Sequence, residues 1–215
     1  MKRLLSLRPL LLLGFVMLYT AAAAQNWKLK TETDGMKVYY RSTDAGHEIK
    51  LVTNLSTRLS ALAALFNNVP DYPRWGYKVQ NSRLLQRVSP TEFYFYQEFD
   101  FPWPLTDRDV VMHTQIIQDP TTRVITLYSN AQPDYMAENP NLVRVKKAQV
   151  RWTFTPAGNN LVQAEYWLRS DPGGLLPDWT VSMAADTGPV QTVQNIRKLL
   201  TEDQYRNAQL PYIRD

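Results

Sequence analysis

Apolar residues recur at every second position through most of the stretch from residue 82 to residue 170. This alternation is typical of β-strands that bury one face. Short turn sequences interrupt it, with Ser-Pro at 89–90 and Asp-Pro at 119–120. Turns this short can join antiparallel strands but not parallel ones, which need long crossovers. The sequence therefore predicts an antiparallel meander, with strands over residues 82–88, 92–99, 109–117, 123–129, 143–156 and 161–170.

A hairpin and a helix precede the meander. Residues 36–41 alternate in the same way and residues 47–55 continue the pattern after an Asp-Ala-Gly turn, which predicts two paired strands. The spacing of apolar residues then changes to three and four between residues 59 and 69, as in an amphipathic helix. Ser56 or Thr57 is placed to cap this helix, and a proline ends it.

The C-terminal part predicts a second, longer helix that begins near Pro177. Its apolar stripe consists of Trp179, Met183, Val190, Val193 and Leu200. We expect a kink at Gly188-Pro189, because proline removes a backbone hydrogen bond from a helix interior. An early helix, a long run of strands and a late helix favour an α+β fold, in which one antiparallel sheet wraps around the terminal helix.

The segment FDFPWPLTDRDVV, residues 99–111, joins two of the predicted strands. Its two prolines remove backbone donors and bias the residues before them to extended conformations, which predicts a rigid, non-helical connector. Asp107, Arg108 and Asp109 follow where the next strand begins. Three consecutive charges beside an apolar run are costly to bury unless they are paired. The role of the connector therefore depends on whether these side chains are buried with partners or exposed to solvent.

The first 24 residues resemble an export signal, with Lys2, Arg3 and Arg8 ahead of an apolar core from Pro9 to Tyr19 and alanines at 22 and 24. The apolar core is shorter than the roughly 20 residues that span a bilayer, so we expect cleavage after Ala24 and a periplasmic or secreted protein. Three of the 24 Lys and Arg residues lie in this segment, which leaves 21 against 20 acids. A nearly neutral mature chain argues against nucleic-acid binding.

Composition indicates one folded domain. The chain is 44% hydrophobic and 12% aromatic, which excludes a disordered protein, and it contains no cysteine, so packing alone must stabilise it. No repeat or Gly/Ser linker divides the chain. We expect a signal peptide over residues 1–24, one domain over residues 25–205 and a C-terminal tail over residues 206–215, in a protein that is a monomer.

Several motifs together resemble bacterial members of the START family, the lipid transfer domains related to the steroidogenic acute regulatory protein. The resemblance runs from about Trp27 to Leu200. It rests on the order of six segments: DGMKVYYR, VPDYPRW, FYFYQEFDFPWPLTDRDVV, VRWTFTP, DPGGLLPDW and PVQTVQNIRKLL. The resemblance implies a helix-grip fold, in which a curved antiparallel sheet closes over the C-terminal helix around a hydrophobic tunnel for one lipid or sterol-like molecule. It also implies that the C-terminal helix and the loop from Ser129 to Asn141 gate this tunnel.

In this family the residue that matches Arg108 lies at the cavity wall and can pair with a carboxylate on a neighbouring strand. Glu98 is the candidate partner here, because an unpaired buried charge costs several kcal/mol. The alternative is that Asp107, Arg108 and Asp109 form an exposed turn network that holds the connector.

The candidate ligand-binding residues follow from this pairing. If Glu98 points inward, the strand alternation directs Tyr94 and Tyr96 inward as well and Phe93, Phe95, Gln97 and Phe99 outward. The full candidate set is Tyr94, Tyr96, Glu98, Arg108, Met112, Trp179, Met183 and Val190. An aromatic residue in a strand is nevertheless more often a core residue than a ligand contact.

Two other classes of function stay open. A cyclase-like enzyme on the same fold would use Glu98, Arg108 or His113 as its acid or base. A non-carrier interaction module would fill its tunnel with side chains. Metal chemistry is disfavoured, because His47 and His113 are the only histidines and lie on separate predicted strands. We therefore expect no cofactor and no metal, and we expect a lipid carrier that contacts a membrane surface transiently.

Overall fold

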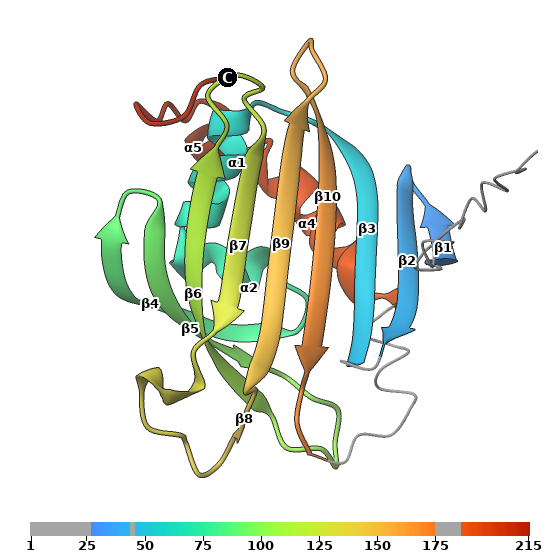
Figure 1. The fold of residues 1–215 in the computed structure, drawn as a ribbon, viewed down its shortest axis with the longest axis vertical. Coiled ribbons are helices and arrows are strands. Elements are labelled where there is room, and N and C mark those ends of the chain that lie inside the picture. The colour runs from blue at the N-terminus through green and yellow to red at the C-terminus, as the bar shows by residue number, and fades with distance from the viewer. Residues whose placement is uncertain (1–26, 44–45, 175–185) are drawn as a thin grey trace, which may run out of the picture.

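The computed structural model describes residues 27–43, 46–174 and 186–215. This part of the chain forms one 10-stranded sheet with the strand order β1-β2-β3-β10-β9-β7-β6-β5-β4, and β8 pairs with β6 beside this path. The strands are β1 (Lys28–Thr33), β2 (Met36–Thr43), β3 (Gly46–Ser56), β4 (Val79–Ser89), β5 (Glu92–Phe99), β6 (Arg108–Gln118), β7 (Ile125–Ala131), β8 (Val143–Arg144), β9 (Lys147–Pro156) and β10 (Leu161–Asp171). The sheet is strongly curved, as Figure 1 shows.

The predicted antiparallel meander is confirmed, with two differences. The strand β1 was missed, because its sequence KLKTET is polar and almost wholly exposed at the edge of the sheet, so no alternation marks it. The predicted strand over residues 143–156 is split into β8 and β9. The short β8 runs parallel to the start of β6, where Arg108 and Asp109 pair with Val143 and Arg144.

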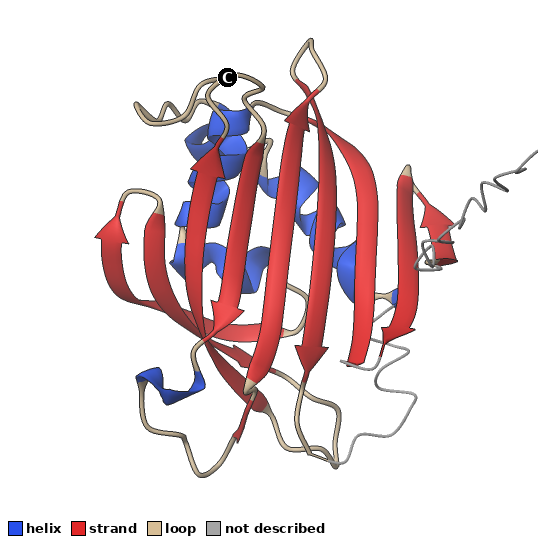
Figure 2. Ribbon diagram, in the orientation of Figure 1, coloured by secondary structure: helices blue, strands red, loops and turns tan. Residues whose placement is uncertain are grey.

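Five short helices lie against one face of the sheet (Figures 1 and 2). In the described part of the chain they are α1 (Leu59–Asn67), the 3₁₀ helix η1 (Val69–Asp71), α2 (Tyr72–Trp75), α4 (Gly188–Leu199) and α5 (Asp203–Arg206), with a further 3₁₀ turn η2 (Pro133–Tyr135) outside this group. The helix α4 begins with Pro189 in its first turn, where no backbone donor is needed. The predicted beginning of this helix at Pro177 lies outside the described residues. No helix in the described ranges has the length and apolar character to span a membrane.

The core lies between the concave face of the sheet and the helices. Phe66 of α1 is its centre, with ring centroids 5.1 Å from Trp75, 5.3 Å from Trp152 and 5.4 Å from Phe154. All four side chains are buried. Aromatic rings at these separations add packing energy beyond their buried area, so this cluster joins α1 and α2 to β9.

The residues expected to form a C-terminal tail pack against the domain instead. Ile213 is buried, and the backbone of Arg214 exchanges two hydrogen bonds with the side chain of Gln118 on β6. Asp215 accepts hydrogen bonds from the backbone and hydroxyl of Ser60 at 2.8 and 2.7 Å. It thereby caps the N-terminus of α1, whereas the predicted caps Ser56 and Thr57 precede the helix and make no capping bond.

Replacing Asp215 with alanine is expected to lower the free energy of unfolding by about 1 kcal/mol, because it leaves the backbone N–H and the hydroxyl of Ser60 in α1 without their acceptor. The measurement is urea denaturation followed by circular dichroism. Asp203→Ala is the matched control, since Asp203 also lies at a helix start but its side chain is 79% exposed and pairs only with Arg206 in the same helix. Equal unfolding midpoints for the two variants would show that the cap contributes nothing.

Two acidic side chains are completely buried on the outer, convex side of the sheet. Glu48 accepts hydrogen bonds from Arg41 on β2 and from Trp167 and Arg169 on β10, the two strands that flank its own. Asp109 forms a two-bond ion pair with Arg144, at 2.8 and 3.0 Å. Burial alone raises the pKa of the Glu48 carboxyl, but the hydrogen bonds from Arg169, Trp167 and Arg41 outweigh it, so this pKa is lowered overall.

Candidate functional site: an apolar cavity with one buried guanidinium

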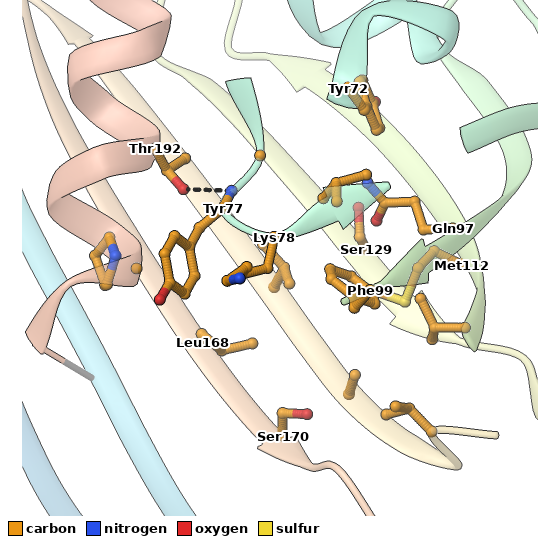
Figure 3. Close-up of a pocket in the computed structure, with 18 of the residues that line it drawn as sticks. Tyr72, Tyr77, Lys78, Gln97, Phe99, Met112, Ser129, Leu168, Ser170 and Thr192 are labelled. Carbon is orange, nitrogen blue, oxygen red and sulfur yellow. Dashed lines mark hydrogen bonds between the residues drawn. The ribbon is translucent and has the colours of Figure 1, made fainter. Parts of the chain in front are cut away.

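A cavity of about 360 Å³ lies between the concave face of the sheet and the helices α2 and α4. Cavities of this size hold small organic ligands. Its walls are almost entirely apolar. The strands supply Ile49, Phe95, Phe99, Val110, Met112, Leu127, Val150, Trp152, Tyr166 and Leu168, and the helices supply Phe66, Tyr72, Trp75, Pro189 and Thr192. Figure 3 shows part of this lining.

The aromatic cluster around Phe66 closes one end of the cavity. Tyr72 is buried there, and its hydroxyl donates a hydrogen bond to the backbone oxygen of Phe66 at 2.6 Å. Burial raises the pKa of Tyr72 and of Tyr166 far above the ordinary value, so both stay neutral. The aromatic residues therefore form a floor, and a cavity remains above them rather than a filled tunnel.

The other end, which we call the mouth, is formed by residues 76–78, 100–102, 172, 188, 189 and 192. Lys78 and Asp100 form an ion pair there with side chains 41% and 39% exposed, so this end reaches solvent. The hydroxyl of Thr192 on α4 accepts a hydrogen bond from the backbone of Tyr77 at 3.2 Å, which ties the helix to the rim (Figure 3). The Pro-Trp-Pro connector supplies Phe101 and Pro102 to the same rim.

Arg108 lines the cavity and is only 3% exposed. Its guanidinium donates to the backbone oxygens of Thr106 and Gly173 and lies 4.2 Å from the ring centroid of Phe101, and its Nε has no partner. No carboxylate pairs with it among the described residues. Because burial destabilises the charged form, the pKa of Arg108 is lowered from its ordinary value, but arginine stays protonated in proteins.

The structure reverses the predicted choice of face on β5. Phe95, Gln97 and Phe99 line the cavity, whereas Glu98 belongs to the opposite face, where it accepts a hydrogen bond from Tyr96 at 2.9 Å. Glu98 therefore does not pair with Arg108. The prediction failed because alternation separates the two faces of a strand but does not say which face is concave.

Tyr94 and His113 also lie on the outer face of the sheet. Their rings stack with centroids 4.3 Å apart, and His113 Nε2 contacts a carboxylate oxygen of Glu92 at 2.7 Å. Tyr94 and His113 do not border the cavity, and Glu98 does not border it either. His113 and Glu98 are therefore not placed to act as acid or base on a ligand in the cavity. Among the described residues no cluster of three or more His, Cys, Asp and Glu could hold a metal ion.

The remaining candidates divide into three groups. Met112 lines the cavity as predicted. Val190 packs against the core from α4 but does not border the cavity, where its neighbour Pro189 stands instead. Trp179 and Met183 lie outside the described residues.

The loop proposed as a gate is fastened to the outer face of the sheet. Arg144 donates to the backbone oxygens of Pro133, Met136 and Ala137 at 2.7, 3.1 and 3.3 Å. Tyr135 stacks on Tyr94 with centroids 4.6 Å apart. These contacts place residues 133–137 on the side opposite the cavity, so the gate assignment of this loop was wrong.

Several polar residues of the cavity wall were not predicted from the sequence. Gln97 and Ser129 line it from β5 and β7, and Tyr40 and His47 border it from β2 and β3 with a hydrogen bond between them. Ser170 faces it from β10, directly across from His47. The signal for Gln97 was present in the sequence, since it is a polar residue on the strand face that carries Phe93, Phe95 and Phe99.

An apolar cavity between a curved antiparallel sheet and a C-terminal helix defines a helix-grip protein that holds a hydrophobic small molecule. Residues 16–204 match the family model of the START domain, and the chain therefore belongs to the START domain family. This confirms the resemblance and the fold class.

Three similar proteins agree with this membership. An uncharacterized protein of Pseudomonas aeruginosa is 30% identical, over 82% of this chain and 87% of its own length. The human phosphatidylcholine transfer protein is 26% identical, over 78% of this chain and 80% of its own length. Among solved structures, a STAR-related lipid transfer protein from Xanthomonas axonopodis is 27% identical and superimposes with a TM-score of 0.75, over 82% of this chain and 99% of that one.

Proposed function

We propose that this protein is a lipid carrier that holds one amphipathic lipid, with the acyl region in the cavity and an anionic headgroup at Arg108. The observation that carries the proposal is the buried guanidinium of Arg108, which forms no ion pair in the described part of the chain and has Asp107 only as an acidic neighbour beyond ion-pair distance. A buried charge without a counterion is costly, and a ligand phosphate or carboxylate would supply the missing one.

The energetics favour a carrier that needs no covalent step. Burying one methylene gains about 0.8 kcal/mol, so ten methylenes supply on the order of 8 kcal/mol before the cost of ordering the chain. The apolar walls and the aromatic floor suit this kind of binding. Relatives named as lipid transfer proteins support the same role.

We further propose that the mature protein acts as a monomer after export, in the periplasm or outside the cell. The export signal expected in residues 1–24 supports this location. A carrier would there move lipids across an aqueous space between membranes.

The test is native mass spectrometry of the mature protein purified from its own cells, followed by organic extraction of the bound material. The expected result is one lipid per protein, bearing an acidic headgroup. A protein that is empty and also takes up no phospholipid or fatty acid from vesicles would overturn the proposal.

Trp103 supports transient contact with a membrane. It lies in the connector that forms the rim of the mouth, and its side chain is 91% exposed. Tryptophan prefers the interface between water and lipid, because its ring is apolar and its N–H is polar. A tryptophan held out beside the mouth would bring the opening to the membrane surface.

Replacing Trp103 with alanine is expected to lower association with vesicles of anionic phospholipid several-fold and to slow lipid transfer by a similar factor. Cosedimentation and a fluorescent-lipid transfer assay measure the two effects. Tyr128→Ala is the control, since Tyr128 is 42% exposed but lies on the outer face of the sheet. Equal loss in both variants, or none in either, would contradict a docking role for Trp103.

A further inference from the structure

Gln97 places a neutral amide in the cavity wall, on the strand face that otherwise carries phenylalanines. It is 9% exposed and borders the cavity from β5. Among the described residues no side chain or backbone group forms a hydrogen bond with its amide. Figure 3 shows Gln97 among the residues that line the cavity, in the same region of the wall as Ser129, Phe99 and Met112. A buried amide without a partner costs free energy, so its presence here requires an explanation.

The register between β5 and β6 places Gln97 close to Arg108. Phe99 is opposite Arg108, and Gln97 is opposite Val110. Gln97 and Arg108 are therefore diagonal neighbours on the same face, with Cβ atoms roughly 7–8 Å apart. Both side chains are long enough to reach two groups of one small molecule. Arg108 is the residue closer to the connector, so Gln97 lies one step further into the cavity.

This spacing restricts the chemistry of the ligand. In a free fatty acid the negative charge and the carbonyl are one group, so Arg108 would bind both and leave Gln97 unpaired. In a sterol the polar end is a single hydroxyl. A glycerophospholipid instead separates its phosphate from its acyl carbonyl by the glycerol backbone, a length comparable with the distance between the two side chains.

We infer that Gln97 donates a hydrogen bond to an acyl carbonyl of a glycerophospholipid whose phosphate lies at Arg108. The inference rests on the proposed function and adds the substrate class to it. On the side of Gln97 away from Arg108 the wall includes Phe95, Met112 and Leu127, whose apolar side chains suit an acyl chain. Gln97 thus marks the boundary between the polar and apolar parts of the bound lipid.

The experiment compares two probes that differ only at the linkage, hexadecanoyl glycerophosphate with an ester and hexadecyl glycerophosphate with an ether. Dissociation constants are measured by isothermal titration calorimetry below the micelle concentration. We expect the wild type to bind the ester roughly three- to tenfold more tightly, the effect of one neutral hydrogen bond. In Gln97→Met, which keeps the length of the side chain but cannot donate, the two probes should bind equally.

Gln163→Met is the matched control, because it makes the same substitution at an exposed position of β10 that does not border the cavity and should keep the preference for the ester. Equal binding of the two probes to the wild type, or a preference that survives in Gln97→Met, would overturn the inference while leaving the carrier function standing. A wild-type protein that binds neither probe and no diacyl phospholipid would instead overturn the proposed function. Circular dichroism melting of each variant confirms that it is folded.

Discussion

Replacing Asp109 with alanine is expected to lower the free energy of unfolding by about 3–5 kcal/mol, because it leaves Arg144 buried without its counterion. The carboxylate of Asp109 accepts hydrogen bonds from Nε and Nη2 of Arg144, and both side chains are only 1% exposed. Asp109 also raises the pKa of Arg144, since it stabilises the charged form more than burial opposes it. The protein cannot relieve the loss by releasing a proton from an arginine.

Loss of the ion pair with Asp109 should also loosen the loop of residues 133–137, to which Arg144 donates hydrogen bonds. Its guanidinium also contacts the backbone oxygens of residues 133, 136 and 137, so a displaced Arg144 frees this segment for limited proteolysis. Urea denaturation measures the global effect and protease digestion the local one. Glu138→Ala is the control, because its ion pair with Lys146 is 54% and 64% exposed and is worth at most about 1 kcal/mol. A loss below about 1 kcal/mol for Asp109→Ala would mean that the buried pair does not anchor the loop.

Arg108→Met is expected to separate stability from binding. Removing a buried charge that has no acidic partner should leave the ligand-free protein as stable as the wild type or more stable by about 1–2 kcal/mol. Binding of an anionic phospholipid should become roughly 10- to 100-fold weaker, since one charge-assisted hydrogen bond is lost. Structural and ligand-binding roles of Arg108 thus predict opposite changes in the melting midpoint.

Differential scanning calorimetry of delipidated protein and lipid titration measure the two quantities. Lys37→Met is the control for loss of one positive charge, because the Lys37 side chain is 51% exposed and does not border the cavity. A large drop in stability of Arg108→Met with unchanged lipid affinity would show that the guanidinium holds the connector and does not bind a headgroup.

Charged residues 107–109 show how far sequence reasoning could go. The sequence analysis placed Arg108 in the cavity wall through the family resemblance, and it does line the cavity. The alternative of a turn network is correct for Asp107, which accepts a hydrogen bond from the backbone of Phe101 at 2.8 Å. Asp109 turns to the outer face and pairs with Arg144, 35 positions along the chain. The three charged residues at the start of β6 therefore lie in three different environments: the connector, the cavity wall and the outer face of the sheet.

The main error in the predicted site was the choice of which alternating set of β5 residues faces the cavity. Tyr94, Tyr96 and Glu98 were taken as cavity residues, and the structure places the other set there. A strand rich in aromatic residues on both faces gives no hydrophobic contrast between them. Tyr96 is 4% exposed on the outer side because the ring is covered by Arg83, whose guanidinium lies 4.9 Å from its centroid.

Local sequence patterns were sufficient to predict the strands β2–β7, β9 and β10, the helix α1 and the non-helical connector, because backbone propensity, periodicity and proline act within a few residues. Only the tertiary structure decided which face of β5 is concave, which carboxylate meets Arg144, and that Asp215 caps α1. These features depend on contacts between residues far apart in the chain. Sheet curvature and helix packing bring them together, and no local pattern encodes either.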